Sequence, residues 1–355
     1  MKKSLLSTLL IGFSLVASAQ QDPQYTQFMF NKQLYNPAVT GFDNNHCLSL
    51  LARTQYAKYL DESYTLNDNA SSNTEIYGGN GAKTVTFSYG APIPFARSPK
   101  GKNSGGVGMS VYSDKAAYIN TTYLKLDLAA KRALPFDRTI GVGINIGAMQ
   151  KAIDFNGFLF KDPGDPLIGA NKQISKMNVN FGAGVWFNDL NRKNLTLGYA
   201  IQNLSKKEFS FGLINAVRPG LHQYFNASMD FDILGPGMVL TPSLMVKSSQ
   251  DSEGIFANPD FSLAGILKYN QNLSVGLGIR TSTKTFESFS AIIGWNLNEA
   301  LRIGYSFDFN TTKLRFNNSN THELVLNYCF RLTIPERVEI ILVDPVFLDK
   351  DPNIE

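Results

Sequence analysis

An alternation of apolar with small or polar residues, repeated along most of the chain, is the sequence feature that most constrains the fold. In 139–149 (TIGVGINIGAM), isoleucine or valine stands at every second position from 140 to 146, with glycine or asparagine between. Residues 194–202 (NLTLGYAIQ) and 272–280 (NLSVGLGIR) repeat the pattern. Because successive side chains of a strand point to opposite faces, each segment predicts a strand with one apolar face and one small or polar face.

The same pattern predicts about fourteen strands, an even number as in bacterial outer-membrane barrels. Most are close to the ~9–11 residues that a tilted strand needs to cross a bilayer. We therefore predict an all-β fold, a transmembrane antiparallel up-and-down β-barrel over 46–330. The predicted strands are 46–56, 83–91, 104–113, 119–130, 138–149, 176–187, 194–203, 221–232, 237–247, 259–269, 272–281, 285–297, 300–310 and 321–330.

The predicted connections alternate in length, as the short periplasmic turns and longer outer loops of such barrels do. Tight turn sequences such as Asn270-Gln271 and Asn298-Glu299 are assigned to the periplasmic end, where 92–103 is longer than the pattern predicts. The connections assigned to the outer end are 57–82, 150–175, 204–220, 248–258 and 311–320. With an even number of strands, both chain ends are expected in the periplasm.

The alternative to a membrane barrel is a secreted all-β protein whose apolar strand faces pack into a core. Charged residues on the face opposite the apolar one argue against it, because a barrel turns that face toward its lumen. Examples are Lys125 and Asp127 in strand 119–130; Arg53 and Arg280 are also predicted to face the lumen.

Residues 1–19 have the features of a secretory signal peptide: two early lysines, an apolar run over 5–16 and the small residues Ala-Ser-Ala at the end. The mature chain is expected to begin at Gln20. The cleavage point has no cysteine for a lipid anchor, and no later window approaches the ~18 apolar residues of a membrane-spanning helix. We expect Sec export to the outer membrane.

Charge and motifs exclude several functions. The chain has 33 basic and 29 acidic residues, and loss of the two signal lysines lowers the net charge from +4 to about +2, without the basic excess of a nucleic-acid binder. The histidines, His46, His222 and His322, are scattered, and no Gly-x-Ser-x-Gly elbow, metal cluster or phosphate loop is present. We expect no enzyme activity, no cofactor, no metal and no nucleic-acid partner.

Residues 20–45 lack the alternation. Asp22-Pro23 is a favourable helix start, and Tyr25, Phe28 and Met29 follow at helical spacing. We predict a short helix that folds into the inner mouth of the barrel as a plug and ends at Asn36-Pro37. A disordered export leader is the alternative.

Residues 331–355 follow the last predicted strand and are predicted to form a periplasmic tail. They contain six acidic residues against Arg331, Arg337 and Lys350, with an apolar stretch over 338–343. Two interpretations stay open: the tail pairs as an added strand with a periplasmic protein, or it is a frayed acidic end.

The two cysteines lie near the periplasmic ends of the first and last predicted strands, which become neighbours when a barrel closes. By alternation Cys47 and Cys329 share the lumen face. They are therefore a candidate disulfide across the seam, which the oxidising periplasm permits. The alternative is two free thiols out of register.

Two stretches resemble a known family. DPQYTQFMFNKQLYNPAVTGF (22–42) resembles the D-P-x-[FY]-[ST]-Q-[FY] … N-P-A-x-[AT]-G opening of the PorP/SprF family of type IX secretion membrane proteins. RIGYSFDFNTTKLRFNNSNTHELVLNYCF (302–330) resembles its closing G-Y-S-[FY]-D … H-E-L-x-L-x-Y-x-F pattern. The resemblance implies structural or partner-contact roles for the residues that match these two motifs, which are Asp22, Pro23, Tyr25, Gln27, Asn36, Pro37, Tyr305, Asp308, His322 and Glu323.

The resemblance implies an outer-membrane barrel of the type IX secretion and gliding machinery that partners or anchors a large secreted surface adhesin. Its implied contacts are outer-membrane lipid, the periplasmic part of the machinery and the adhesin. The competing function is a general or substrate-specific porin, suggested by the charged residues predicted to face the lumen. The acidic tail departs from family members that stop at the barrel.

Overall fold

A computed structural model describes most of the chain from Asp22 to Leu332. The signal peptide expected at 1–19 and the tail beyond Leu332 lie outside the described residues. The described residues are 22–43, 45–56, 64–66, 74–76, 81–94, 103–116, 119–154, 173–205, 208–211, 214–217, 220–233, 235, 237–250, 259–270, 272–311 and 320–332. Among them, no helix is long and apolar enough to cross a membrane.

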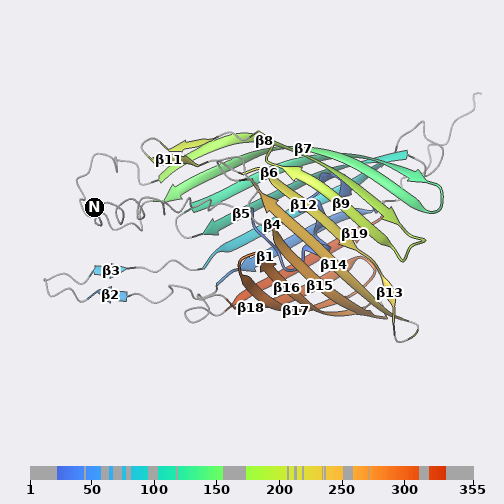
Figure 1. Cartoon of the computed structure of the whole chain (residues 1–355). Coiled ribbons are helices and arrows are strands. Elements are labelled where there is room, and N and C mark those ends of the chain that lie inside the picture. Colours follow the sequence, from blue (N-terminus) through green and yellow to red (C-terminus); the bar gives the residue numbers. More distant parts are fainter. Residues whose placement is uncertain are drawn as a thin grey trace, which may run out of the picture.

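The described strands form one closed antiparallel wall and two small separate hairpins (Figure 1). The wall consists of β1 (His46–Thr54), β4 (Lys83–Pro94), β5 (Asn103–Ala116), β6 (Ile119–Leu134), β7 (Arg138–Asp154), β8 (Gln173–Asp189), β9 (Leu195–Gln202), β12 (His222–Ser228) with β13 (Phe231–Asp232), β14 (Met238–Ser249), β15 (Asp260–Tyr269), β16 (Leu273–Ser282), β17 (Phe286–Asn296), β18 (Leu301–Asn310) and β19 (Thr321–Phe330). The hairpins pair β2 (Tyr64–Leu66) with β3 (Thr74–Ile76) and β10 (Phe209–Phe211) with β11 (Ile214–Val217).

The wall closes because its first and last strands pair. Each wall strand is hydrogen-bonded to the wall strands before and after it in sequence, and β1 pairs with β19 from His46 opposite Phe330 to Thr54 opposite His322. A closed sheet has no edge strand with unpaired backbone groups. Taking β12 and β13 as one strand, the described wall has fourteen, which confirms the predicted antiparallel barrel.

One predicted strand, 221–232, is interrupted. The structure ends β12 at Ser228 and resumes as β13 at Phe231. Between them the N–H of Asp230 donates to the carbonyl oxygen of Lys193 at 2.7 Å instead of joining the ladder. Opposite this break β14 carries Pro242, which has no N–H to donate.

The two faces of the wall differ as the alternation predicts. On the outward face, large apolar side chains are exposed, including Ile144 at 59% and Leu277 at 58%. On the inward face, polar and charged side chains are buried, including Arg53 at 3% and Lys125 at 4%. This arrangement, apolar outside and polar inside, is that of barrels that cross a membrane.

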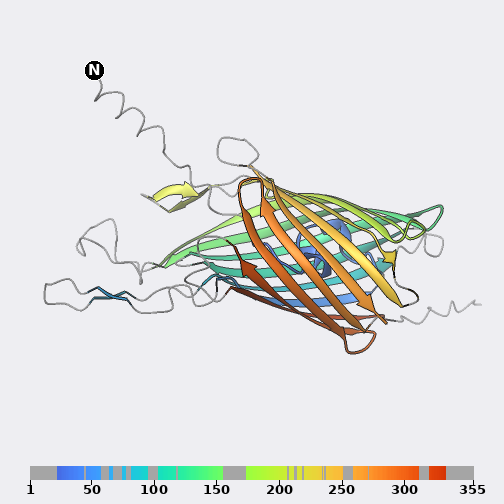
Figure 2. The same ribbon diagram turned by 60° about the horizontal axis from the view of Figure 1, so that its bottom comes forward.

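The longest connections between the wall strands lie at one end of the barrel, although the short turn 283–285 also lies there. We call the end with the longer connections the outer end; it carries 55–82 and 203–221, which contain the two hairpins. The opposite end, the inner end, carries short turns such as 135–137 and 297–300. Figures 1 and 2 show the β2–β3 hairpin well beyond the outer end of the wall.

The N-terminal segment forms three short 3-10 turns, η1 (Phe28–Phe30), η2 (Lys32–Leu34) and η3 (Pro37–Val39), so the predicted helix is wrong. Tyr25 and Phe28 are both buried in the lumen core. However, the backbone N–H groups of Thr26 and Gln27 donate to a wall carboxylate, as described below, and not to carbonyls of a helical turn. Contacts with the wall therefore replace the hydrogen bonds that a helix would make.

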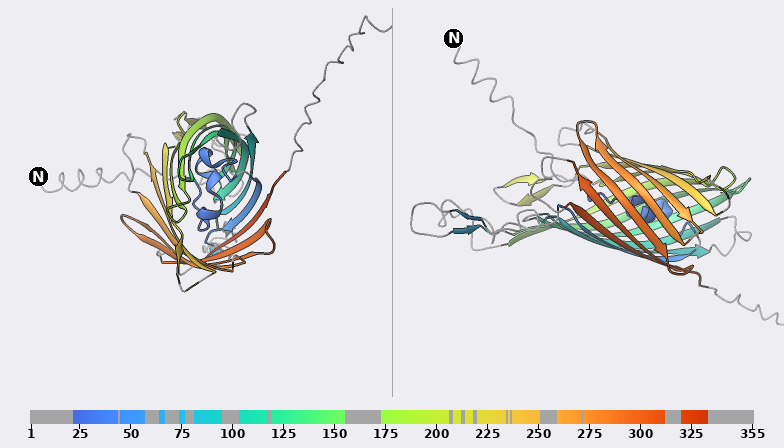
Figure 3. Two further views of the ribbon diagram at one scale, coloured as in Figure 1. Left: turned by 90° about the vertical axis from the view of Figure 1, so that its right-hand side faces the viewer. Right: turned by 90° about the horizontal axis from the view of Figure 1, so that it is seen from below.

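The position of this segment also differs from the expectation. Residues 22–43, called the plug from here on, run along the lumen from the outer end to the inner end (Figures 2 and 3). The carbonyl oxygen of Asp22 accepts from Lys247 near the outer end of β14, whereas that of Phe42 accepts from Lys131 near the inner end of β6. The plug is therefore not confined to the inner mouth, and its first residue, Asp22, lies near the outer end and not at the inner end where both chain ends were expected.

An apolar cluster explains why the plug lies this deep in the lumen. Its aromatic and aliphatic side chains are almost fully buried, and removing such surface from water is favourable by about 25 cal/mol per Å². The cluster joins plug residues Tyr25, Phe28, Leu34 and Tyr35 to wall residues Leu51, Tyr224, Met245, Ala264, Ile266, Ile292 and Val325.

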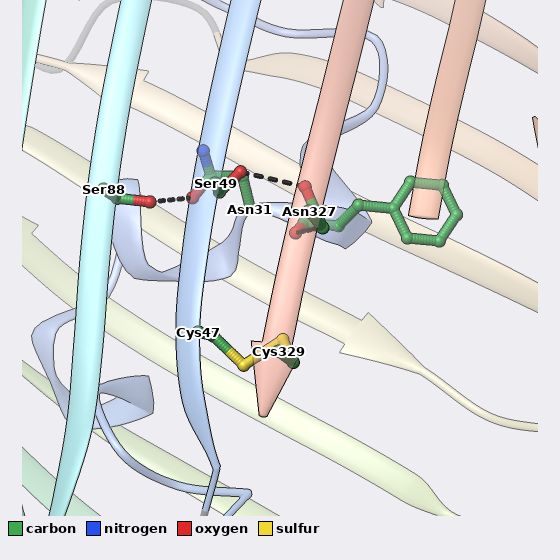
Figure 4. Close-up of a disulfide and its surroundings, with 7 residues drawn as sticks. Asn31, Cys47, Ser49, Ser88, Asn327 and Cys329 are labelled. Atoms are coloured by element: carbon green, nitrogen blue, oxygen red, sulfur yellow. Dashed lines mark hydrogen bonds between the residues drawn. A yellow bond between two sulfur atoms is a disulfide. The ribbon is translucent and has the colours of Figure 1, made fainter. Parts of the chain in front are cut away.

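A disulfide joins the first and last strands at the inner end of the wall. Cys47 lies opposite Cys329 in the β1–β19 register, with their Cα atoms 4.1 Å apart (Figure 4). One step along the same face, the Ser49 hydroxyl donates to Asn327 at 3.0 Å. The covalent bond and this hydrogen bond therefore lie on the same seam.

We predict that reduction destabilises the barrel. The bond closes a loop with a sequence separation of 282 residues, and the chain-entropy model assigns such a loop on the order of 5 kcal/mol. Reductant is expected to lower the temperature at which folded protein converts to the unfolded gel mobility. The double variant Cys47→Ser/Cys329→Ser is the control and should show the lower temperature with or without reductant. An unchanged wild-type transition would contradict the prediction.

Candidate functional site

A carboxylate on the last strand binds the backbone of the plug. Glu323 of β19 points into the lumen and is 1% exposed. Its two oxygens accept the N–H groups of Thr26 at 2.9 Å and Gln27 at 2.8 Å, and one oxygen also accepts from Arg53 at 3.0 Å. Hydrogen bonds to a charged acceptor are about twice as strong as neutral ones, so Glu323 fixes where the plug crosses the seam.

Asp308 of β18 holds the same plug residue through its side chain. The Thr26 hydroxyl lies 2.8 Å from both carboxylate oxygens of Asp308. Arg53 and Arg280 approach Asp308 at 3.4 Å and 3.9 Å, and Arg280 also donates to the Thr26 hydroxyl at 3.1 Å.

Together Arg53, Arg280, Asp308 and Glu323 form a cluster of two arginines and two carboxylates whose charges cancel. This cluster is called the clamp from here on. Each of the four is at most 6% exposed. Buried charges are tolerated only when paired and hydrogen-bonded, because their loss of hydration is costly. Thr26 and Gln27 supply part of that pairing, so the clamp is complete only with the plug in place.

The Asn36-Pro37 pair forms a turn that the opposite side of the wall holds. The Asn36 side chain accepts from the N–H of Ala38 at 3.0 Å, and Pro37 occupies the first position of η3. These are the residue types that start helical turns. The Asn36 amide donates to the carbonyl oxygen of Val185 on β8 at 2.9 Å.

Glycines of the inward face make room for this part of the plug. A Cβ at Gly143 of β7 would lie 2.5 Å from the backbone of Pro37 and Ala38, and one at Gly106 of β5 would lie 2.0 Å from the carbonyl oxygen of Thr40. Real Cβ atoms do not approach other atoms so closely, so any larger residue would displace the plug. The glycine alternation of the sequence therefore marks the seat of the plug.

At the outer end, Asp22 joins the plug to several strands. Its carboxylate accepts from the hydroxyls of Tyr112 and Tyr224, each at 3.2 Å. Burial raises the pKa of Asp22, whereas the nearby His222 and Lys247 lower it. Their combined effect outweighs that of burial, so the pKa of Asp22 lies well below its usual range. Asp22 is therefore an ionised anchor near the outer mouth.

The remaining residues of the opening motif also face the lumen. The Tyr25 hydroxyl lies 2.6 Å from that of Thr86 on β4, and Pro23 lines a small cavity beside Tyr35. All six matching residues of the opening motif, from Asp22 to Pro37, thus contact or face the wall.

Two residues of the closing motif point the other way. The Tyr305 hydroxyl lies 2.8 Å from Nδ1 of His322 on the outward face, with Tyr305 midway along β18 and His322 at the outer end of β19. His322 is next to Glu323 in sequence, so alternation sends one side chain out and the other in. The closing motif therefore contributes to two surfaces, and of the four residues Tyr305, Asp308, His322 and Glu323 it is Asp308 and Glu323 that meet the plug.

Some plug contacts were not singled out from the sequence. Thr26 stands inside the opening motif, and its hydroxyl makes the contacts described above. Gln33 donates to Asp127 at 3.0 Å, and Asn327 donates to the carbonyl oxygen of Phe30 at 2.9 Å. The charged residues predicted to face the lumen could have indicated these contacts, because buried charges require hydrogen-bond partners.

Chemically, the site holds a polypeptide backbone. Its donors and acceptors are carboxylates, guanidinium groups and amides directed at peptide groups and at one hydroxyl. In the part of the chain that the structure describes, no group of three or more His, Cys, Asp or Glu residues could hold a metal ion.

The comparisons with known proteins agree with the resemblance of the two end motifs. The model of a family described as type IX secretion system membrane protein PorP/SprF matches residues 17–328. No curated protein matches the chain.

Several solved structures are similar to the barrel. The toluene transporter TodX of P. putida is 12% identical with a TM-score of 0.49, covering 86% of this chain and 94% of that one. The toluene transporter TbuX of Ralstonia pickettii is 11% identical with a TM-score of 0.48, covering 85% and 93%. A FadL homologue of Pseudomonas aeruginosa is 11% identical with a TM-score of 0.44, covering 88% and 95%. These likenesses are too distant to indicate what this chain binds.

Substitution Glu323→Gln is predicted to loosen the plug. It removes one carboxylate from the clamp and leaves Arg53 and Arg280 with a single counter-charge, and breaking a buried ion pair in this way costs about 3–5 kcal/mol. Urea unfolding should show a loss of this size. Glu299→Gln is the matched control, because Glu299 is exposed in an inner turn and such changes usually stay within about 0.5 kcal/mol. Equal effects of the two variants would show that Glu323 does not hold the plug.

Gly143→Ala is predicted to destabilise the protein by about 1–3 kcal/mol through overpacking against η3. The matched control is Gly278→Ala on the lumen face of β16, where a Cβ would meet its nearest neighbour, the Cβ of Ser290, at an ordinary 3.4 Å. Proteolysis of the plug in folded protein should be faster for the Gly143 variant alone. A plug equally protected in both variants would contradict the assigned seat.

Proposed function

Because the chain belongs to the PorP/SprF family of type IX secretion system membrane proteins, we propose that it is an outer-membrane barrel that partners or anchors a large secreted surface adhesin. The outer end receives the adhesin, and the inner end meets the periplasmic machinery. The family match carries this proposal, and three features of the molecule support it.

The first supporting feature is the filled lumen. The plug places a buried apolar cluster and a paired charge cluster inside the wall. A protein that works by holding a partner needs a rigid wall and two exposed ends, whereas a porin needs a water-filled channel. The plugged barrel fits a holding role.

The second feature is the difference between the two ends. The outer end carries the long connections with the β2–β3 and β10–β11 hairpins (Figure 1). The inner end has a cavity of about 260 Å³ between the plug and the seam, lined by Met29, Phe42 and Cys47 among others. Cargo and machinery thus have separate surfaces on which to bind.

The third feature is the apolar outward face, which supports placement in the outer membrane. Its exposed leucine, isoleucine and valine side chains would be unfavourable in water, whereas lipid matches them. Outer-membrane barrels reach that membrane after export, as the signal peptide expected at residues 1–19 predicts.

The porin alternative rested on the charged residues predicted to face the lumen. They do face inward, but they contact the plug: Lys125 binds the carbonyl oxygen of Leu34, Asp127 accepts from Gln33, and Arg53 binds Thr26. Charges with such partners do not line an open channel. The porin function therefore remains only as the competing outcome of the conductance measurement described below.

The test places a photo-crosslinking residue at Lys284, in the turn between β16 and β17 at the outer end, or at Asn298, in an inner turn. In living cells the outer probe should capture a large secreted surface protein, and the inner probe should capture periplasmic components. Deletion of the gene should remove the same adhesin from the cell surface.

Two results would overturn the proposal. One is an unchanged amount of surface adhesin in the deletion strain, together with no capture at Lys284. The other is a steady, large conductance of the wild-type protein in planar bilayers, which would favour the porin.

A further inference from the structure

The plug contacts both strands that must meet for the barrel to close. On one side of the seam, Arg53 of β1 donates to the Thr26 hydroxyl at 3.3 Å. On the other side, Glu323 of β19 accepts the N–H groups of Thr26 and Gln27. The same two plug residues therefore bridge β1 and β19.

The neighbouring strands extend this bridge. The Tyr25 hydroxyl lies 2.6 Å from Thr86 of β4, beside β1, and the Thr26 hydroxyl lies 2.8 Å from Asp308 of β18, beside β19. Nearer the inner end, Asn31 accepts from Ser88 of β4 at 3.1 Å (Figure 4). The plug thus spans four consecutive strands of the wall, two on each side of the seam.

The plug is also joined to the wall by the chain itself. It reaches the inner end at Phe42 and continues within a few residues into β1 at His46. Its opposite end, Asp22, lies near the outer mouth. A segment so attached lies beside β1 from the start, whereas β19 is more than 270 residues away in sequence.

Insertion into a wall that is already closed would be obstructed. Between Pro37 and Gly41 the plug backbone touches the inward face so closely that a Cβ at Gly106 or Gly143 would clash with it, and a Cβ at Gly184 would clash with the Asn36 side chain. The clamp carboxylates would also lack the N–H and hydroxyl groups of Thr26 and Gln27 until the plug arrived. Docking onto an open sheet avoids both obstacles.

From these contacts we infer that the plug is an internal template for barrel closure. It docks on β1 and β4 first and presents Thr26 and Gln27 to Glu323 and Asp308. It thereby guides β19 into register, and the Cys47–Cys329 bond then locks the seam. Bringing distant ends of a chain together has an entropic cost that grows with loop length, and a docked template lowers the barrier by supplying contacts at the moment of closure.

The test uses formation of the disulfide as the readout of closure, because pairing of β1 with β19 places Cys47 opposite Cys329 and so speeds their oxidation. Full-length protein is unfolded and reduced, then refolded into detergent micelles in a redox buffer, and free thiols are trapped with a maleimide at successive times. Thr26→Val, which removes the hydroxyl that meets Asp308, Arg280 and Arg53, should slow disulfide formation by about 3- to 10-fold, the rate equivalent of one lost hydrogen bond.

The control is Thr196→Val, the same change at a lumen-facing residue whose hydroxyl meets Ser228 on β12 and not the plug. Tyr25→Phe is a milder second variant that removes only the contact with Thr86. Its control is Tyr199→Phe, whose hydroxyl meets Gln223 on the outward face. The Tyr25 variant keeps the test informative if the Thr26 variant fails to refold.

A template contact must already exist in the transition state for closure, so its loss slows folding and changes unfolding little. If the plug instead docks after closure, Thr26→Val and Tyr25→Phe will form the disulfide as fast as wild type and will only unfold faster. That result would overturn the inference.

Discussion

The pairing of buried charges inside the barrel is the interaction on which the rest of the structure depends. Arg53, Arg280, Asp308 and Glu323 sit where water is largely excluded, and charges survive there only with close partners. The wall alone brings these four side chains together but leaves carboxylate oxygens to be satisfied. The backbone and hydroxyl of the plug satisfy them, so wall and plug form one structure.

The inward face of the wall is shaped for that plug. Glycines on β5 and β7 let the plug backbone between Pro37 and Gly41 approach closely, and a glycine on β8 leaves space for the Asn36 side chain. Around the seam, the wall presents the Glu323 carboxylate and the Asn327 amide to the plug. Small residues and polar groups on the inward face therefore have different effects on the plug. The glycines leave space for it, and the polar groups fix its position through hydrogen bonds.

Because the plug fills the lumen, the two ends of the barrel remain as the surfaces on which protein partners can bind. The outer end carries long connections with two hairpins, and the inner end joins the plug, the first strand and the disulfide. The proposed role, in which the protein holds a secreted partner at the outer end and meets the secretion machinery at the inner end, agrees with this division.

The sequence by itself determined the fourteen-stranded wall and its two faces, because alternation is a local property that each wall strand carries in its own residues. It also placed Cys47 and Cys329 on one face of neighbouring strands, and its end motifs contain Asn36, Asp308 and Glu323. Only the tertiary structure decided the path of the plug and its 3-10 turns. Those features depend on backbone groups near Thr26 meeting side chains almost 300 residues away, and no local pattern encodes such a contact.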